Sequence, residues 1–201
     1  MSDKTIHPSN EHFERWADTY EDSYMQALIF DRVHQSVLDL VPGDLQPENI
    51  LDVGCGTGRL LRRLGQQFPQ ARLNGVDLAE EMIAQANRLT PGARFYVSQA
   101  ETLPLPDASV DLVLSTMSFH HWADQVQGIR QVARVLRTGG VFILADAVMP
   151  YWLWWIFRHG KHVSARQRGA MFAQAGLIMQ SEGREFWRHL LISVGKKTAP
   201  A

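Results

Sequence analysis

Apolar runs of strand length alternate with segments of helical period along most of this chain, and no other feature constrains its fold as strongly. The predicted strands lie at 50–54, 72–76, 94–98, 110–115 and 141–146. Between them, 59–68, 80–89 and 125–136 have the apolar spacing of helices, and Gly139-Gly140 is interpreted as the signal that ends the last one. Strands that alternate with helices form a parallel sheet covered on both faces. The sequence therefore predicts a doubly wound α/β fold.

The two ends of the chain add helices and a hairpin to this core. Two helices are predicted before the first strand, at 12–20 and 24–40. After the fifth strand, a predicted helix at 165–175 precedes two strands joined by a short connection, 177–184 and 189–195. This hairpin predicts an antiparallel end to a mostly parallel, seven-stranded sheet.

We expect one domain over the whole chain. Its predicted parts are an N-terminal helical cap (1–45), a cofactor-binding core (46–146) and a substrate-side cover with the closing hairpin (147–201). The 201 residues, 45% of them apolar, suffice for one buried core and are too few for two ordinary domains.

Charge and cysteine content exclude several classes of protein. Lys and Arg number 20 against 21 Asp and Glu, so we expect no nucleic-acid partner. A single cysteine, Cys55, forms no internal disulfide, and no metal-ligand spacing is present, so neither an oxidising compartment nor a metal is expected. No apolar run resembles a signal peptide or reaches the ~18 residues of a spanning helix. The expected location is the cytoplasm.

A glycine-rich turn follows the first predicted strand, where a parallel sheet opens a crevice for ligands. Gly54, Gly56 and Gly58 lack the Cβ atoms that would keep a small molecule away from the main chain. Asp77 ends the second strand, where a carboxylate accepts hydrogen bonds from ribose hydroxyls. The two features together predict a site for a nucleoside cofactor. The alternatives are a turn that only connects strand to helix, and a dinucleotide site, whose fingerprint would place a glycine at Arg59.

The segment Leu-Asp-Val-Gly-Cys-Gly-Thr-Gly at 51–58 resembles the first motif of the class I S-adenosylmethionine-dependent methyltransferases, and especially of the small-molecule branch. Among these, the enzymes of ubiquinone and menaquinone biosynthesis are similar. The resemblance implies a Rossmann-like methyltransferase fold and S-adenosylmethionine as cofactor. The residues that it places around this cofactor are Tyr20, Asp52, Gly54, Cys55, Gly56, Asp77, Leu78, Met82, Gln99, Ala100, Glu101 and Ser115.

The resemblance also implies roles for several of these residues. Asp52 and the backbone of the glycine loop would hold the methionine part, Asp77 the ribose, and Leu78 and Met82 the adenine. Tyr20 would close over the cofactor. Gln99 stands where the family usually has an Asp that accepts from the adenine amino group, and its carbonyl oxygen is able to accept the same bond.

Two adjacent histidines, His120 and His121, follow the fourth predicted strand and are the candidate catalytic residues. Histidine titrates nearest neutral pH, and an acceptor that carries a proton needs a base. In the alternative interpretation, one histidine packs below the cofactor or caps the next helix while the other is solvated. Asp124 is predicted to be the N-cap of the helix at 125–136.

An aromatic and basic segment at 149–162 follows the fifth strand, and in the resembling family this connection often covers the acceptor. Trp152 and Trp155 are therefore candidate substrate contacts. Packing on the sheet edge, a dimer contact and shallow membrane contact are the open alternatives.

The leading functional hypothesis is methyl transfer from S-adenosylmethionine to a small organic acceptor, aromatic or lipid-like. Two other classes stay open: a cofactor-binding module without transfer that serves a partner protein, and a nicotinamide-dependent oxidoreductase. The sequence leaves the acceptor atom and the oligomeric state undefined.

Overall fold

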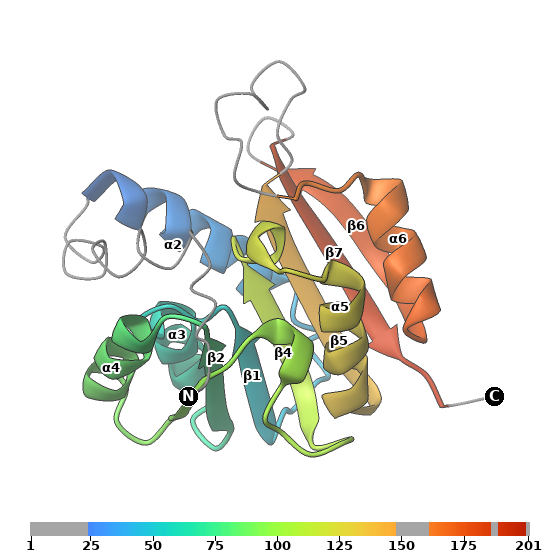
Figure 1. Cartoon of the computed structure of the whole chain (residues 1–201). Coiled ribbons are helices and arrows are strands. Elements are labelled where there is room, and N and C mark those ends of the chain that lie inside the picture. The colour runs from blue at the N-terminus through green and yellow to red at the C-terminus, as the bar shows by residue number, and fades with distance from the viewer. Residues whose placement is uncertain (1–23, 148–160, 186–188, 200–201) are drawn as a thin grey trace, which may run out of the picture.

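A seven-stranded sheet in the order β3-β2-β1-β4-β5-β7-β6 organises the computed structural model, which describes residues 24–147, 161–185 and 189–199 (Figure 1). The strands are β1 Asn49–Val53, β2 Arg72–Asp77, β3 Arg94–Val97, β4 Val110–Thr116, β5 Leu136–Ala147, β6 Leu177–Glu185 and β7 Leu190–Lys197. The first five strands pair in parallel, whereas β7 is antiparallel to both β5 and β6. The predicted doubly wound sheet and its closing hairpin are both confirmed.

Helices cover both faces of this sheet (Figure 1). They are α2 Tyr24–Asp39, α3 Arg59–Gln67, α4 Glu80–Leu89, α5 Gln125–Val135 and α6 Ala165–Gln174, with short 3-10 helices η1 Ala100–Thr102 and η2 Phe119–His121. One buried cluster joins α2, α3 and α4 to the sheet, and a second joins α5 and α6 to its other face. The helix predicted at 12–20 lies outside the described residues. Within the described part of the chain, no helix has the length and apolarity needed to cross a membrane.

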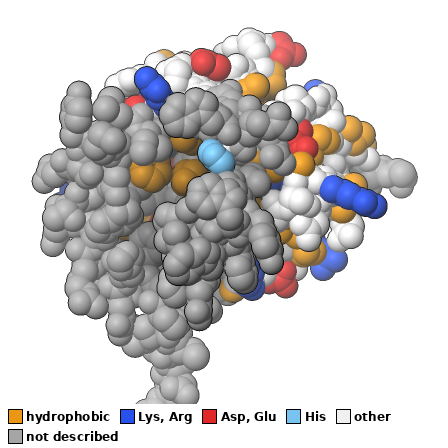
Figure 2. Space-filling model, turned by 90° about the horizontal axis from the view of Figure 1, so that it is seen from above, with side chains coloured by type: hydrophobic (Ala, Val, Ile, Leu, Met, Phe, Trp, Pro, Cys, Tyr) orange, Lys and Arg blue, Asp and Glu red, His pale blue; other side chains and the backbone are white. Residues whose placement is uncertain are grey.

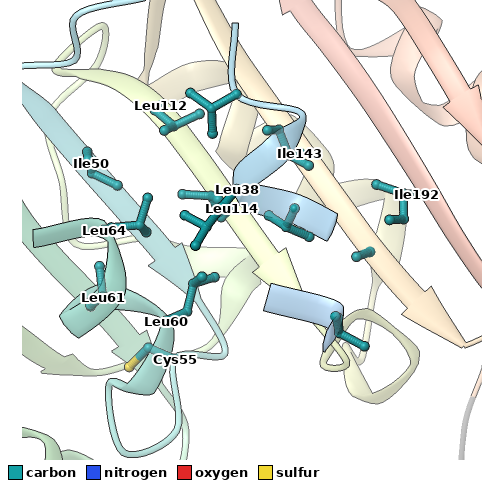
Figure 3. Close-up of a cluster of buried hydrophobic side chains, with 14 of the residues drawn as sticks. Leu38, Ile50, Cys55, Leu60, Leu61, Leu64, Leu112, Leu114, Ile143 and Ile192 are labelled. Atoms are coloured by element: carbon teal, nitrogen blue, oxygen red, sulfur yellow. The ribbon is translucent and has the colours of Figure 1, made fainter. Parts of the chain in front are cut away.

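Alternating side chains on the central strands produce these two clusters. On β4, Leu112 and Leu114 point toward α2 and α3, while Val113 between them points toward α5. Figure 3 shows Leu112 and Leu114 packed with Ile50 of β1 and with Leu60 of α3. All five side chains are almost fully buried. The first and fourth strands are thus fixed from both sides, and the loops that leave their carboxyl ends have a rigid base.

The connection between α5 and β5 differs from the prediction. The helix ends at Val135, and Leu136 already pairs with Val110 of β4. Gly139-Gly140 therefore lie inside β5 and do not end the helix. A Cβ on Gly140 would lie 3.1 Å from the carbonyl oxygen of Asp111, so this glycine permits a close approach of two backbones.

Capping residues define the starts of α5 and α6. The Asp124 carboxylate accepts a hydrogen bond from the Gln127 amide at 3.0 Å, which confirms it as an N-cap. Ser164 and Gln167 form a reciprocal capping box at the start of α6. One turn further, the buried Arg168 guanidinium donates to the carbonyl oxygen of Leu191 in β7. Desolvation lowers the pKa of Arg168 to about 10, so it stays cationic at neutral pH.

Candidate cofactor-binding and active site

A cavity of about 180 Å³ opens next to the carboxyl ends of β1, β2 and β4, where the strand order reverses. Nine of the predicted site residues line it: Gly54, Gly56, Asp77, Leu78, Met82, Gln99, Ala100, Glu101 and His121. Viewed from above, hydrophobic side chains and a histidine are visible between the residues that the structure does not describe (Figure 2). The sheet topology thus gathers residues that are up to 67 positions apart, from Gly54 to His121, around one space.

The glycine loop is held by the neighbouring strand and by a serine beyond β4. The amides of Gly54 and Cys55 both donate to the carbonyl oxygen of Val76, at 2.8 and 3.0 Å. Ser118 donates from its hydroxyl to the carbonyl oxygen of Val53 at 3.1 Å and accepts from the indole N–H of Trp122. Gly54 has a φ of +77°, and a Cβ there would lie 2.0 Å from the Ser118 Oγ. Only glycine fits this point of contact between the first and fourth strands.

A Gly54→Ala substitution is therefore expected to weaken S-adenosylhomocysteine binding at least about tenfold and to lower the melting temperature. The new methyl group displaces Ser118, and alanine is strained at a positive φ, a cost of about 1–3 kcal/mol. Calorimetric titration and thermal unfolding measure the two effects. Gly43→Ala is the matched control, because a Cβ at Gly43 meets nothing within 4 Å. An unchanged affinity in Gly54→Ala would show that this loop does not contact the cofactor.

Asp77 has the position expected of a ribose-binding carboxylate. Its Oδ2 accepts from the Gly56 amide at 2.9 Å and its Oδ1 from the Ala79 amide at 3.0 Å. Burial raises the pKa of Asp77, and these two hydrogen bonds oppose that rise. A carboxylate oxygen is able to accept two hydrogen bonds, so each Asp77 oxygen keeps acceptor capacity for a ligand in the cavity. Beside it, Leu78 is 45% exposed in the same cavity, which provides an apolar surface for a flat base.

A second cavity of about 40 Å³ adjoins the first and contains the other two loop residues predicted to touch the cofactor, Asp52 and Cys55. The Asp52 side chain is 1% exposed, and its Oδ1 has no hydrogen-bond partner. Burial, and then the charge of Asp77, raises the pKa of Asp52 to about 8. A buried carboxyl group without a donor matches a ligand that brings one, such as the ammonium group of a methionine.

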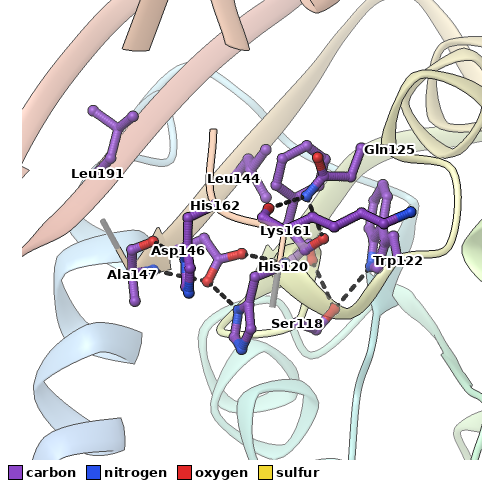
Figure 4. Close-up of polar contacts among 12 residues, drawn as sticks. Ser118, His120, Trp122, Gln125, Leu144, Asp146, Ala147, Lys161, His162 and Leu191 are labelled. Carbon is purple, nitrogen blue, oxygen red and sulfur yellow. Dashed lines mark hydrogen bonds and ion pairs between the residues drawn. The ribbon is translucent and has the colours of Figure 1, made fainter. Parts of the chain in front are cut away.

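Behind the main cavity, His120 and Asp146 form a hydrogen-bonded pair (Figure 4). His120 Nδ1 lies 2.7 Å from Asp146 Oδ1, and the His120 amide donates to Asp146 Oδ2 at the same distance. The Ala147 amide donates to Oδ1 as well, so three N–H groups surround a carboxylate that is 1% exposed. Because a carboxylate only accepts, the proton of the neutral His120 ring lies on Nδ1, and Nε2 keeps its lone pair.

The His120 ring contacts two other imidazoles, tilted by 44° against His121 and stacked on His162. Its ring centroid lies 3.9 Å from that of His121 and 5.2 Å from that of His162. Burial, and then the neighbouring His120, lowers the pKa of His121 to about 4, so His121 is neutral at physiological pH. His162 is fixed by its Nδ1, 3.2 Å from the carbonyl oxygen of Ala147. The backbone amide of Lys161 donates to the carbonyl oxygen of His120, which binds this segment to η2.

Among the described residues, two of the predicted site residues, Ser115 and His120, line neither the second cavity nor the main cavity. Ser115 is fully buried below it, where its hydroxyl faces that of Ser118 at 3.3 Å, because the strand alternation directs this side chain into the protein. Tyr20, Trp152 and Trp155 lie outside the described residues.

The residues of this region that sequence reasoning missed include Phe30, His34, Ser118 and Asp146. Asp146 had a usable signal, because it ends the strand next to the one that precedes His120, and the ends of adjacent parallel strands meet. For Phe30 and His34 the sequence carries no signal of a site, because residues on the apolar face of a helix are predicted to pack in the core.

The fold and the glycine-loop site define a Rossmann-like methyltransferase fold, and comparison with known proteins agrees. Residues 51–144 match the family described as "Methyltransferase domain". A malonyl-[acyl-carrier protein] O-methyltransferase of Dechloromonas aromatica is 37% identical over 134 residues, which cover 67% of this chain and 48% of that protein. A demethylmenaquinone methyltransferase of Chlorobaculum parvum is 34% identical over 110 residues, which cover 55% of this chain and 45% of that protein. The chain thus spans about half the length of these curated relatives.

Solved structures share the whole architecture at low sequence identity. An S-adenosylmethionine-dependent methyltransferase from Thermotoga maritima superimposes with a TM-score of 0.75 at 20% identity, over 94% of this chain and 99% of that one. A geranyl diphosphate methyltransferase in complex with sinefungin also has a TM-score of 0.75, at 16% identity over 84% of this chain and 78% of that one.

Residues 51–144 of this chain thus carry a region similar to the methyltransferase domain, and the fold is that of the S-adenosylmethionine-dependent methyltransferases.

Proposed function

We propose that this protein transfers a methyl group from S-adenosylmethionine to a small organic acceptor. The observation that supports this proposal most is the lining of the main cavity, which combines Asp77 and the apolar Leu78 and Met82 with His121 of η2. The first three suit a nucleoside, and the imidazole suits an acceptor beside it.

The cofactor supplies a methyl group on a positively charged sulfur, and the protein residues provide alignment. Asp77 would accept the ribose hydroxyls and Asp52 the ammonium group of the methionine part. Leu78 and Met82 would pack against the base, and Gln99 would accept from its amino group. These residues line the two adjoining cavities, which share Phe30, Gly54, Gly56 and Thr116.

His120, whose ring centroid lies 3.9 Å from that of the cavity-lining His121, is our candidate for the group that removes a proton from the acceptor. Asp146 fixes its ring and leaves Nε2 as a proton acceptor, which is the arrangement of a base oriented by a carboxylate. His121, neutral and in the wall of the cavity, would contact the acceptor itself. The neighbouring rings of His121 and His162 restrict the rotation of His120.

The relatives' names support an acceptor that is a small organic group, either free or carried on a protein. They name malonyl-[acyl-carrier protein] and demethylmenaquinone as the substrates of two proteins that resemble this chain. We propose the same broad class for this protein.

Two experiments test the proposal. Calorimetric titration with S-adenosylhomocysteine and with NAD is expected to show binding of the first alone, which distinguishes a methyltransferase from a nicotinamide-dependent enzyme. Incubation with methyl-labelled S-adenosylmethionine and a metabolite extract is expected to label one or a few small molecules. Binding without any labelling would instead support a cofactor-binding module that serves a partner.

A further inference from the structure

We propose that His34 of α2 recognises the α-carboxylate of the cofactor's methionine end, opposite Asp52 in the second cavity. The inference rests on the proposed function and adds a residue that determines which nucleosides are accepted. It assigns the methionine end to two side chains of opposite character: an acceptor, Asp52, for the ammonium group, and a donor, His34, for the carboxylate.

Two residues that line the second cavity each have a buried side-chain atom without a hydrogen-bond partner. Three buried side-chain nitrogen or oxygen atoms in the described part of the chain have no hydrogen-bond partner, namely Nδ1 of His34, Oδ1 of Asp52 and Nε of Arg168. The first two residues line the same cavity of about 40 Å³ and are only 4% and 1% exposed. An unpaired buried polar atom costs free energy, and two of them around one small space indicate a ligand that pairs with both.

The chemistry of the pair matches an amino-acid group. Burial, and then the charges of Arg63 and Arg59, lowers the pKa of His34 to about 4, so the ring is neutral and carries a single N–H. A carboxylate only accepts hydrogen bonds, which suits that N–H, whereas an ammonium group only donates, which suits Asp52. Arg59 lines the same cavity beside its partner Asp31, 3.2 Å away, and adds positive charge near the bound carboxylate.

The two cavities are connected, so the amino-acid end of a nucleoside bound in the main cavity is able to reach the second one. Phe30, Gly54, Gly56 and Thr116 line both spaces. A nucleoside bound at Asp77 is therefore able to extend its tail past the glycine loop to α2. The N-terminal helix thereby becomes part of the cofactor site through His34, which lies one helical turn after Phe30.

Calorimetric titration of three nucleosides tests the assignment. S-adenosylmethionine carries both charged groups, decarboxylated S-adenosylmethionine only the amine, and 5′-methylthioadenosine neither. In His34→Phe, which keeps a ring and removes both nitrogens, the affinity for S-adenosylmethionine is expected to fall about 10- to 100-fold. The affinities for the other two are expected to stay within about twofold, so the preference for the carboxylate disappears.

Two further variants make the result specific. His34→Asn places an amide nitrogen where Nδ1 lies and is expected to restore most of the preference, whereas His34→Gln places it near Nε2 and is not. Should the Phe variant be unstable, the Gln variant takes its place in the comparison. Arg32→Ala removes a positive charge from the exposed side of the same helix and is expected to bind all three nucleosides as the wild type does.

The outcomes separate this inference from the function on which it rests. If the wild type binds S-adenosylmethionine and His34→Phe binds it equally well, the role of His34 is refuted. Equal weakening of all three nucleosides would refute it too, because it indicates a structural role only. If the wild type binds none of them, the proposed function itself fails.

Discussion

Replacement of His120 by Ala is expected to lower kcat for methyl transfer by about 100- to 10,000-fold at saturating S-adenosylmethionine, the usual range for loss of a general base. The reason is geometric. Asp146 fixes the ring through Nδ1 at 2.7 Å, so Nε2 of the neutral ring is left as the proton acceptor. The measurement is single-turnover transfer to the acceptor found by labelling. S-adenosylhomocysteine affinity is expected to change little, because His120 does not line either cavity.

Asp146→Asn is expected to produce a similar loss of kcat by a different route. The amide group of Asn donates as well as accepts, so it no longer forces the His120 proton onto Nδ1 and leaves the wrong tautomer populated. His162→Phe is the matched control: it keeps a ring against His120 and removes no proton acceptor that the mechanism uses. Full activity in both His120→Ala and Asp146→Asn would show that transfer proceeds by alignment alone.

The parts of the site that could be predicted from the sequence are those in which a local pattern carries the geometry. The glycine loop and Asp77 follow directly from the order of strand, turn and helix. Asp124 was identified as a cap because capping depends on residues three positions apart. The helices and strands of the core lie within a few residues of their predicted ends, apart from the start of β5.

The parts that could not be predicted depend on tertiary contacts. His120 was predicted as a base, yet its carboxylate partner lies 26 positions later, and only the parallel register of β4 and β5 brings them together. The position of His34 suggests an ordinary core residue until the cavity next to it is seen. Gly139-Gly140 resembles the end of a helix, because the close approach of the Arg137 and Asp111 carbonyl oxygens that requires Gly140 arises only when β5 forms and pairs with β4.

Asp52→Asn is expected to weaken S-adenosylhomocysteine binding about 10- to 100-fold at pH 8 and to remove its dependence on pH. An ammonium group requires the ionised carboxylate, but the pKa of Asp52 in the free protein is raised to about 8. Below that pH, binding must release a proton, so the wild-type affinity is expected to fall about tenfold for each pH unit from pH 8 to 6. Calorimetry in buffers of different ionisation enthalpy measures the released proton directly, and no release would show that Asp52 does not contact the amine.

The same raised pKa predicts an opposite effect of Asp52→Asn on stability. The folded protein binds a proton at Asp52 more tightly than the unfolded chain, whose pKa is 3.8, so this stabilisation is complete below that value and is lost as the pH rises toward 8. The Asn variant has no such loss. Its melting temperature is therefore expected to exceed that of the wild type at pH 8, with the difference closing toward pH 4. A saturating concentration of S-adenosylhomocysteine should reverse the order at pH 8, because the ammonium group compensates the buried charge in the wild type alone.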